Sequence, residues 1–324
     1  MPENTTLLPL PAEPLLDLLR KEAEEHDLEC TQTDGWLDLS TQYGIISARI
    51  DDGAVLLRLS SETEGELTVL RDAVNAHVSG QFVPKWSNVR TGRPPNLTVL
   101  RLAGKTQISP SFLRLTLSGD THRLTGAGFH IRFVAPAAGK PHWPRIDATG
   151  RTIWFDKTPL PHRPVYTIAE VRAGQADIDI FRHEGGRTIA WADSLEVGDP
   201  VGVLGPGGSG LPEANRLSLW GDETAMPAIR RILSEAPEDT VGKVTIAVRD
   251  PDDIFLWGRR GFEVRWLVRS DPTTLAHAMI ADRAGADKAY LWFAAGAAET
   301  KIARQHAAEL NIAKQRRHIA AYWT

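Results

Sequence analysis

The stretch WGDETAMPAI, residues 220–229, decides the fold of the C-terminal third of the chain. Apolar residues at positions 225, 226, 229, 232 and 233 recur at helical spacing and predict a helix from Thr224 to Ser234. Before it, residues 217–220 predict a buried strand that ends near Trp220. Backbone N–H groups and the helix dipole at such a start favour an anionic group. The turn residues Gly221, Asp222, Glu223 and Thr224 are therefore candidates for nucleotide contact. The alternative is an ordinary capped turn, and its two carboxylates weaken a phosphate site.

Downstream of this stretch, short apolar strands alternate with helices. We expect strands at residues 217–220, 243–249, 264–268 and 290–294, and helices at 273–282 and 300–310. Such alternation indicates an α/β domain with a parallel sheet, in which ligands bind at the carboxyl ends of the strands.

Upstream, residues 97–212 have a different texture. Segments such as FLRLTLSG, HIRFVAP, RTIWFD and ADIDIFRH are short, rich in β-forming residues and punctuated by Gly and Pro. This pattern is typical of an antiparallel β-barrel or sandwich.

A break at TGRPPN, residues 91–96, separates this part from an N-terminal α+β domain. That domain is predicted to contain helices at residues 15–25 and 67–78 and strands at 36–39, 44–50 and 54–59. The expected domains are residues 1–92, 93–213 and 214–324. We expect few contacts to cross the break, and residues 1–90 to fold independently.

Composition excludes several classes of protein. The 324 residues carry a net charge of −4, which does not suggest a nucleic-acid-binding protein. The single Cys30 cannot form an intramolecular disulfide or, alone, a cysteine metal site, and the ten histidines form no metal motif. The N-terminus does not read as a signal peptide, and no apolar run approaches the roughly 20 residues of a membrane span. We expect a cytoplasmic monomer.

Two further stretches suit a flavin. In PHRPVYTIAEV, residues 161–171, Tyr166 could pack on an isoalloxazine ring, Thr167 could hydrogen-bond its edge, and Arg163 could meet a pyrophosphate. In FRHEGGRTIAW, residues 181–191, the turn that includes Gly186, Arg187 and Thr188 could bind a diphosphate. Without further information, a plain strand with Tyr166 at its edge and ordinary turns are the favoured explanations of these stretches, and His183 could be a capped or surface histidine.

Taken together, these motifs resemble the siderophore-interacting protein family, FAD-dependent ferric-siderophore reductases of the ferredoxin-reductase superfamily. The resemblance runs from about Leu97 to the end of the chain. It rests on TVLRLAGKTQISPSFLRLTLSG, FHIRFVAP, the Tyr-Thr pair, DIFRHEGG, GDPVGVLGPGG, GDETAMPAI, LWFAAGAAETKIARQH and AAYWT. The N-terminal domain resembles one of uncertain role that precedes the reductase in some members.

The resemblance implies a reductase in which NAD(P)H passes electrons through FAD to Fe(III) bound by a siderophore. Tyr166 and Thr167 would lie at the isoalloxazine, and residues 221–224 would border the nicotinamide nucleotide. The FAD phosphates would lie near Arg163, His183, Gly186, Arg187 and Thr188, and an anionic ferric siderophore would face Arg269, Lys301 and Arg304. A flavin reductase for another acceptor and a non-catalytic binding protein remain alternatives.

The sequence departs from the family pattern at three positions. Pro164 and Ala169 stand where the family places arginines around the Tyr-Thr pair, and Arg163 is one residue too early. Ala297 replaces the glutamate that follows the last strand of the motif. We expect these changes to weaken flavin binding and slow the reduction, unless Arg163 or Arg187 compensates.

Overall fold

A computed structural model of the protein describes residues 1–9, 12–26, 28–78, 82–126, 128–136, 141–154, 161–183, 185–254, 258–269 and 274–323. The chain divides into two compact units, each assembled from separated segments. The first unit contains residues 1–100, 131–165 and 200–208, and the second contains residues 101–130, 166–199 and 209–324.

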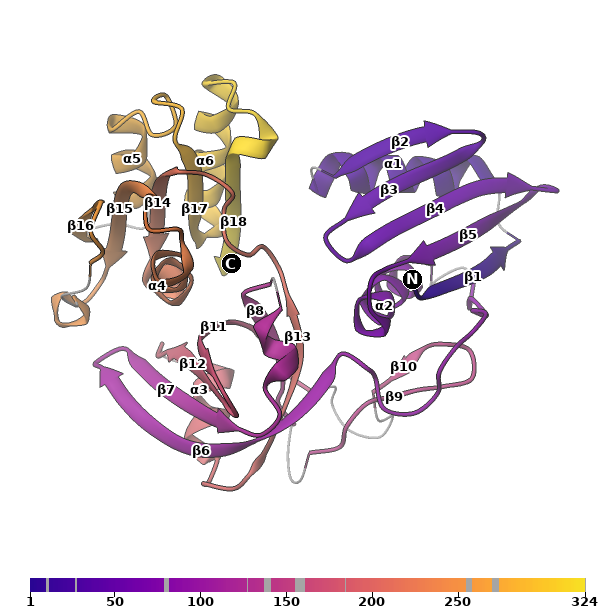
Figure 1. The fold of residues 1–324 in the computed structure, drawn as a ribbon, viewed down its shortest axis with the longest axis horizontal. Coiled ribbons are helices and arrows are strands. Elements are labelled where there is room, and N and C mark those ends of the chain that lie inside the picture. The colour runs from indigo at the N-terminus through magenta and orange to yellow at the C-terminus, as the bar shows by residue number, and fades with distance from the viewer. Residues whose placement is uncertain are drawn as a thin grey trace. The chain divides into compact units, whose positions relative to one another are not determined.

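The N-terminal domain is a five-stranded antiparallel sheet with two helices (Figure 1). Its core explains the packing, because alternate strand residues such as Leu37, Leu39, Leu57 and Leu59 meet the apolar faces of both helices. The sheet order is β1-β5-β4-β3-β2. The elements are β1 (Glu3–Leu8), α1 (Ala12–His26), β2 (Glu29–Thr33), β3 (Trp36–Thr41), β4 (Gly44–Asp51), β5 (Ala54–Ser60) and α2 (Glu64–Val78).

The middle of the chain forms a closed barrel with the strand order β11-β12-β7-β6-β13-β8. Its strands are β6 (Leu97–Ser109), β7 (Phe112–Ser118), β8 (His130–Val134), β11 (Val165–Arg172), β12 (Gln175–Phe181) and β13 (Pro200–Gly207). A separate pair consists of β9 (Arg145–Ile146) and β10 (Thr152–Ile153), and one helix, α3 (Arg187–Ser194), lies between β12 and β13 in the sequence. A short 3₁₀ turn covers His122–Thr125.

The C-terminal part is a parallel sheet with the order β16-β15-β14-β17-β18. Buried side chains on one face of the sheet pack against α4, and those on the other face pack against α5 and α6 (Figure 1). The elements are β14 (Arg216–Asp222), α4 (Met226–Glu235), β15 (Val241–Val248), β16 (Phe262–Val268), α5 (Thr274–Ala281), β17 (Tyr290–Gly296), α6 (Ala297–Glu309) and β18 (Arg317–Trp323). Short 3₁₀ turns cover Glu223–Ala225, Pro251–Asp253 and Lys314–Arg316.

The predicted fold class is confirmed: an N-terminal α+β domain, an antiparallel barrel and an α/β domain with a parallel sheet. Of the described strands, β1, β2, β9 and β18 escaped prediction. The predicted start of α5 at Thr273 lies outside the described residues, and the helix begins at Thr274. The basic run at residues 314–318 is the 3₁₀ turn followed by the start of β18.

The break near Gly92 differs from the expected bare linker. Gly92 exchanges two backbone hydrogen bonds with Ile146, with N···O distances of 3.0 and 2.7 Å. Arg71 of α2, which is 2% exposed, donates from Nε to the carbonyl of Gly150 at 2.8 Å and from Nη1 to Oδ1 of Asn4 at 2.8 Å. A Cβ on Gly150 would come within about 3 Å of the Trp86 and Val89 side chains. The N-terminal domain is thus packed against the β9–β10 hairpin.

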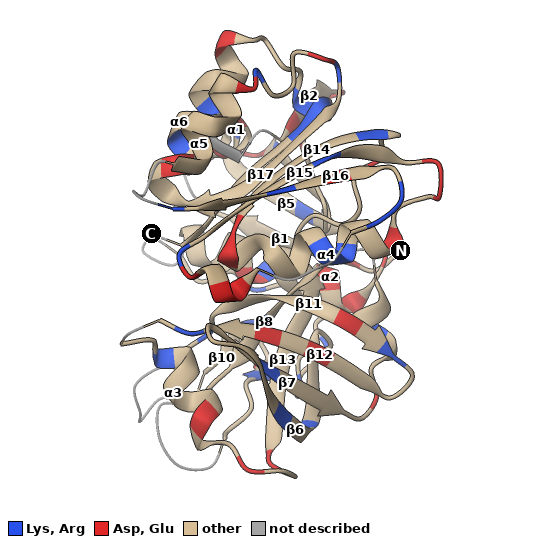
Figure 2. Ribbon diagram, turned by 90° about the vertical axis from the view of Figure 1, so that its left-hand side faces the viewer, with Lys and Arg blue, Asp and Glu red and all other residues tan. Residues whose placement is uncertain are grey.

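Charged residues of both signs are interspersed along the ribbon (Figure 2). In the second unit, some of them join the barrel to the α/β domain: Asp179 of β12 accepts from Nε of Arg114 at 2.7 Å and pairs with Arg230 of α4 at 3.5 Å. Among the helices that the structure describes, none is long and apolar enough to cross a membrane.

Candidate functional site

The Tyr-Thr pair lies on β11, and the structure joins it to the second predicted flavin motif. The phenol of Tyr166 is hydrogen-bonded to the side chain of Thr188. Burial raises the pKa of Tyr166, and the bond to Thr188 opposes that rise. Thr167 is 4% exposed and Thr188 is 6% exposed. Two segments that are 22 residues apart in the sequence therefore hold one aromatic ring in a fixed orientation.

The turn predicted to bind a diphosphate is the start of α3. Gly186 is the N-cap residue and has no side chain of its own to accept from the first N–H groups of the helix. A Cβ on Gly186 would come within about 3 Å of the Nε2 and carbonyl oxygen of His183, so the backbone approaches His183 closely here. Arg187, the first helical residue, is exposed. An eight-residue helix with a glycine at its N-cap and an adjacent guanidinium favours an anionic ligand.

Arg163, in the first unit, lies beside the ring of Trp154 and the side chain of Arg132. Its guanidinium carbon lies 4.5 Å from the ring centroid of Trp154. Nη1 of Arg132, on β8, donates to the carbonyl of Arg163 at 3.4 Å. Desolvation lowers the pKa of Arg163, and the charge of Arg132 lowers it further. The charge of Arg132 therefore acts on Arg163, and two neighbouring cations favour an anion beside them. Sequence reasoning missed Arg132, although the segment HIRFV places it opposite the buried residues Ile131 and Phe133.

At the carboxyl edge of the parallel sheet, Asp222 is fully buried at the end of β14. Its Oδ1 accepts from the backbone N–H of Thr224 at 2.9 Å and from the Thr224 hydroxyl at 2.5 Å. Its Oδ2 accepts from Nε1 of Trp323 at 2.7 Å. Burial raises the pKa of Asp222, and these hydrogen bonds oppose the rise. The Asp222 side chain caps the turn, as the bland interpretation of this stretch expected.

Gly221 has a packing role at the same edge. A Cβ on Gly221 would lie 2.7 Å from the Cβ of Ala225 and from Cδ1 of Ile229. The residue is therefore glycine because α4 packs directly on the end of β14. This observation does not require a ligand near its backbone.

Glu223 and Arg269 form a buried ion pair, with side chains 2% and 7% exposed. Oε1 of Glu223 also accepts from the backbone N–H of Arg249 at 2.6 Å. The prediction that Arg269 faces an anionic ferric siderophore does not suit this geometry, because its guanidinium is buried and already neutralised by Glu223. Of the other two predicted substrate residues, Lys301 is exposed on α6, and Arg304 is exposed and donates to the carbonyl of Ile319 at 3.3 Å.

Trp323 and Glu299 are residues at this edge to which sequence reasoning gave no role. The indole of Trp323 packs over Gly296, where a Cβ would lie 2.6 Å from the ring. Glu299, in the first turn of α6, is 1% exposed, and its Oε1 accepts from the N–H groups of Leu275 and Ala276 at 2.8 and 3.2 Å. Its Oε2 has no hydrogen-bond partner among the residues that the structure describes, and burial raises the pKa of Glu299 to about 7. Glu299 therefore caps the start of α5, two residues after Ala297.

An aromatic cluster links β8 to the last strand. Nε2 of His130 and the hydroxyl of Tyr322 are 2.9 Å apart, and the ring of His318 stacks on Trp292 with centroids 5.6 Å apart. Burial, and then the charge of His130, lower the pKa of His318 to about 4. Burial raises the pKa of Tyr322. His318 and Tyr322 are therefore uncharged near neutral pH.

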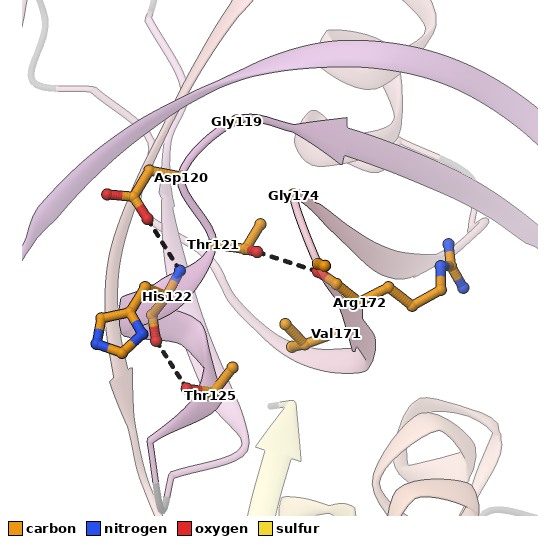
Figure 3. A pocket seen from close by; sticks show the side chains of 9 residues that line it. Gly119, Asp120, Thr121, His122, Thr125, Val171, Arg172 and Gly174 are labelled. Carbon is orange, nitrogen blue, oxygen red and sulfur yellow. Dashed lines mark hydrogen bonds between the residues drawn. The ribbon is translucent and has the colours of Figure 1, made fainter.

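A pocket of about 380 Å³ lies elsewhere in the second unit, and it contains none of the predicted site residues. Figure 3 shows two hydroxyls of its lining bonded to backbone carbonyls: the Thr121 hydroxyl donates to the carbonyl of Arg172 at 3.1 Å, and the Thr125 hydroxyl donates to that of His122 at 2.7 Å. The Arg172 guanidinium pairs with Glu170 and Asp177. These hydrogen bonds and ion pairs stabilise turns of the barrel, which explains the polar residues that line the pocket.

The residues present fit FAD. In the second unit, Tyr166 supplies an aromatic ring and the start of α3, with a glycine at its N-cap, supplies N–H groups. In the first unit, Arg132 and Arg163 supply two guanidinium groups. These are the donor types that a flavin ring and a pyrophosphate require.

Comparisons with known proteins point to the same cofactor. Residues 101–210 match the family model described as "Siderophore-interacting FAD-binding domain", and residues 214–324 match that described as "Siderophore-interacting protein". The chain is 30% identical over 246 residues to the ferric vibriobactin reductase of Vibrio cholerae, covering 69% of this chain and 88% of that protein. It is 29% identical to the NADPH-dependent ferric-chelate reductase of Escherichia coli, covering 70% and 91% of the two chains.

A solved structure gives the same result. The crystal structure of a siderophore utilization protein from T. fusca superposes with a TM-score of 0.59 and 26% identity, covering 70% of this chain and 92% of the other. Both the sequence and the fold of the reductase part are therefore shared with these proteins. The chain belongs to the siderophore-interacting protein family.

Proposed function

We propose that this protein is an NAD(P)H-dependent ferric-siderophore reductase that uses FAD as its cofactor. The observation that carries the proposal is the contact between Tyr166 and Thr188, which brings the Tyr-Thr motif beside the start of α3. The names of the two curated relatives, a ferric vibriobactin reductase and a ferric-chelate reductase, support Fe(III) in a chelate as the electron acceptor.

Bound FAD would supply the conversion of a two-electron hydride donor into single-electron steps. The protein's own residues bind and orient. Tyr166 offers its ring to the isoalloxazine while Thr188 fixes the phenol, and the buried Thr167 lies next to it on β11. The N–H groups at the start of α3, with Arg187, bind phosphate oxygens. Arg163, with the neighbouring Arg132, is a further candidate for phosphate contact.

The nicotinamide nucleotide is assigned to the carboxyl edge of the parallel sheet, where ligands of such sheets bind. There the side chains of Asp222 and Glu223 hold the turn rather than the ligand, because both are buried and hydrogen-bonded within the protein. Thr224 and Trp323, which are more exposed, are the side chains at this edge that can contact the nucleotide.

The substrate is a ferric siderophore, with Lys301 and Arg304 as candidates for contacting an anionic one. Reduction of Fe(III) to Fe(II) lowers the affinity of hard oxygen ligands for the metal, so the chelate releases its iron. We place the reaction in the cytoplasm, which contains the pyridine nucleotides, and we expect a monomer.

The test is flavin binding followed by chelate reduction. Purified protein is saturated with FAD, freed of excess cofactor, and examined for the flavin absorption bands. NADH or NADPH is then added under anaerobic conditions with a catecholate, a hydroxamate and a carboxylate ferric chelate, and Fe(II) is trapped by a coloured ligand.

We expect retained FAD, and Fe(II) formation that depends on the protein, on the nicotinamide and on at least one chelate. Protein that retains no FAD would contradict the proposal. Protein that oxidises NAD(P)H with free flavin or a quinone, but with no ferric chelate, would identify a flavin reductase for another acceptor.

A further inference from the structure

Asp72 connects the N-terminal domain to the segment that leads to the flavin motif. It lies on α2 directly after the buried Arg71 and is half-buried. The hydroxyl of Thr152, on β10, lies 2.8 Å from Oδ1 and 2.9 Å from Oδ2 of Asp72. Arg71 holds the same hairpin through its bond to the carbonyl of Gly150. The position of the Asp72 carboxylate relative to β10 is therefore fixed by two adjacent contacts.

The same segment places Arg163 nearby. Thr152 contacts Asp72, and Trp154, two residues later, lies under the guanidinium of Arg163. Side chains two residues apart in an extended chain point to the same side. Asp72 and Arg163 therefore contact two side chains, those of Thr152 and Trp154, on the same side of this segment. No carboxylate in the described ranges forms an ion pair with Arg163 or Arg132.

The charges of these groups act on each other. The pKa of Arg163 is lowered by desolvation and by Arg132, and Asp72 opposes both. The pKa of Asp72 is raised by desolvation, which the hydrogen bond from Thr152 and the charges of Arg71 and Arg163 oppose. The negative charge of Asp72 thus partly offsets the positive charge of Arg163.

We propose that the N-terminal domain sets the affinity of this protein for phosphorylated flavins, and that Asp72 is the positioning residue through which it does so. The proposal rests on the proposed function, because it requires that Arg132 and Arg163 bind the phosphates of FAD. The negative charge of Asp72 reduces the positive potential at the two guanidinium groups and so weakens their attraction for these phosphates. Removal of its charge therefore strengthens phosphate binding and leaves the binding of a flavin without phosphate unchanged.

The test compares three flavins on three variants of the full chain. FAD, FMN and riboflavin share the ring, but only the first two carry phosphate. Dissociation constants are measured from flavin fluorescence for the wild type, Asp72→Asn and Asp72→Glu. Asp51→Asn, which removes one exposed charge from the same domain at the last residue of β4, is the matched control.

We expect Asp72→Asn to tighten FAD and FMN binding by about threefold to tenfold at low salt, as for one charge several ångströms from a partly exposed site. The gain shrinks as ionic strength rises. Riboflavin binding stays unchanged in Asp72→Asn, and both Asp72→Glu and Asp51→Asn keep the wild-type order of affinities.

Equal changes for riboflavin and FAD would overturn the proposal, because they would indicate a general structural effect. So would an effect of Asp51→Asn as large as that of Asp72→Asn, or unchanged FAD affinity in Asp72→Asn. If the wild type binds none of the three flavins, the proposed function itself fails, a result distinct from a wild type that binds FAD but does not respond at position 72.

Discussion

Two buried arginines, one in each compact unit, are satisfied in different ways. Arg71 donates to uncharged acceptors, the Gly150 carbonyl and the Asn4 side chain, which are 79 and 67 residues away in the sequence. Arg269 pairs with the carboxylate of Glu223 at the ends of two strands of one sheet. The first arginine joins distant segments of chain, whereas the second fixes the edge where a nucleotide is proposed to bind. Replacement of Arg71 and replacement of Arg269 should therefore affect different properties of the protein.

The largest effect is expected at the charged pair. Arg269→Met leaves Glu223 buried without its cation, and breaking one half of a buried pair typically costs about 3–5 kcal/mol. The free energy of unfolding from urea titration should fall by that amount. Arg265→Met, on the same strand but in an exposed pair with Asp282, should change it by less than about 1 kcal/mol. Equal losses in the two variants would contradict the difference drawn here.

The second expected effect is a pH dependence confined to the second unit. The pKa of Glu299 rises from 4.5 to about 7 on folding because the carboxyl is buried. Between these values the folded state binds a proton that the unfolded state has lost, so stability is highest below pH 4.5 and falls as pH rises towards 7. The rise corresponds to at most about 3 kcal/mol.

Unfolding free energies of the wild type and Glu299→Gln, measured across that range, test this directly. The amide keeps an acceptor for Leu275 and Ala276 but cannot ionise, so the difference between the two proteins should grow with pH. Glu263→Gln, which alters an exposed carboxylate of β16, should leave the wild-type slope unchanged. A constant difference between wild type and Glu299→Gln would refute the assignment.

The uncharged network should be weaker. Arg71→Met keeps the apolar stem of the side chain but leaves the Gly150 carbonyl and Asn4 without a donor, at a cost of about 2 kcal/mol. Hydrogen exchange at the amides of Gly92 and Ile146, which bond to each other, should accelerate together with the loss of stability. Arg20→Met, in an exposed pair on α1, is the control and should change neither quantity. Unaltered exchange in Arg71→Met would mean that the N-terminal domain does not depend on this arginine for its docking.

The smallest expected effect concerns the flavin contact. Tyr166→Phe removes only the phenol oxygen that bonds to Thr188, worth about 1 kcal/mol, or about fivefold in FAD affinity. Tyr290→Phe removes an equivalent hydroxyl at the start of β17 and should leave FAD affinity unchanged. Identical FAD affinity in Tyr166→Phe and the wild type would show that the hydroxyl of Tyr166 does not contribute to flavin binding.

The sequence predicted those parts of the fold in which apolar periodicity is local. The alternation of strands and helices after Leu217 and the β-rich segments before it were enough to predict a barrel followed by a parallel sheet. Strand β2 was missed because all five of its residues are exposed, so it has no buried face to produce a pattern. Strand β18 was missed because a basic run precedes it and its residues are only partly buried.

Site prediction had the same limit. The motifs that contain Tyr166 and Thr188 were both recognised, and the family was correctly identified from them and from the other motifs. Their contact could not be predicted, because it depends on how β11 and α3 meet. The burial of Arg269 also had no local signal, since its partner Glu223 is 46 residues away. Whether the other predicted residues contact a cofactor remains a prediction.

The hydrogen bonds between the N-terminal domain and the β9–β10 hairpin limit how such proteins can be recombined. Two prolines at positions 94 and 95 look like a natural joint for exchanging one domain for another between reductases. A chimera cut there would, however, bring in a foreign helix opposite Gly150 and Thr152, whose partners Arg71 and Asp72 would be gone. A stable chimera would need the β9–β10 hairpin to be transferred together with the N-terminal domain. Two separate segments of the gene would therefore have to be exchanged, not one.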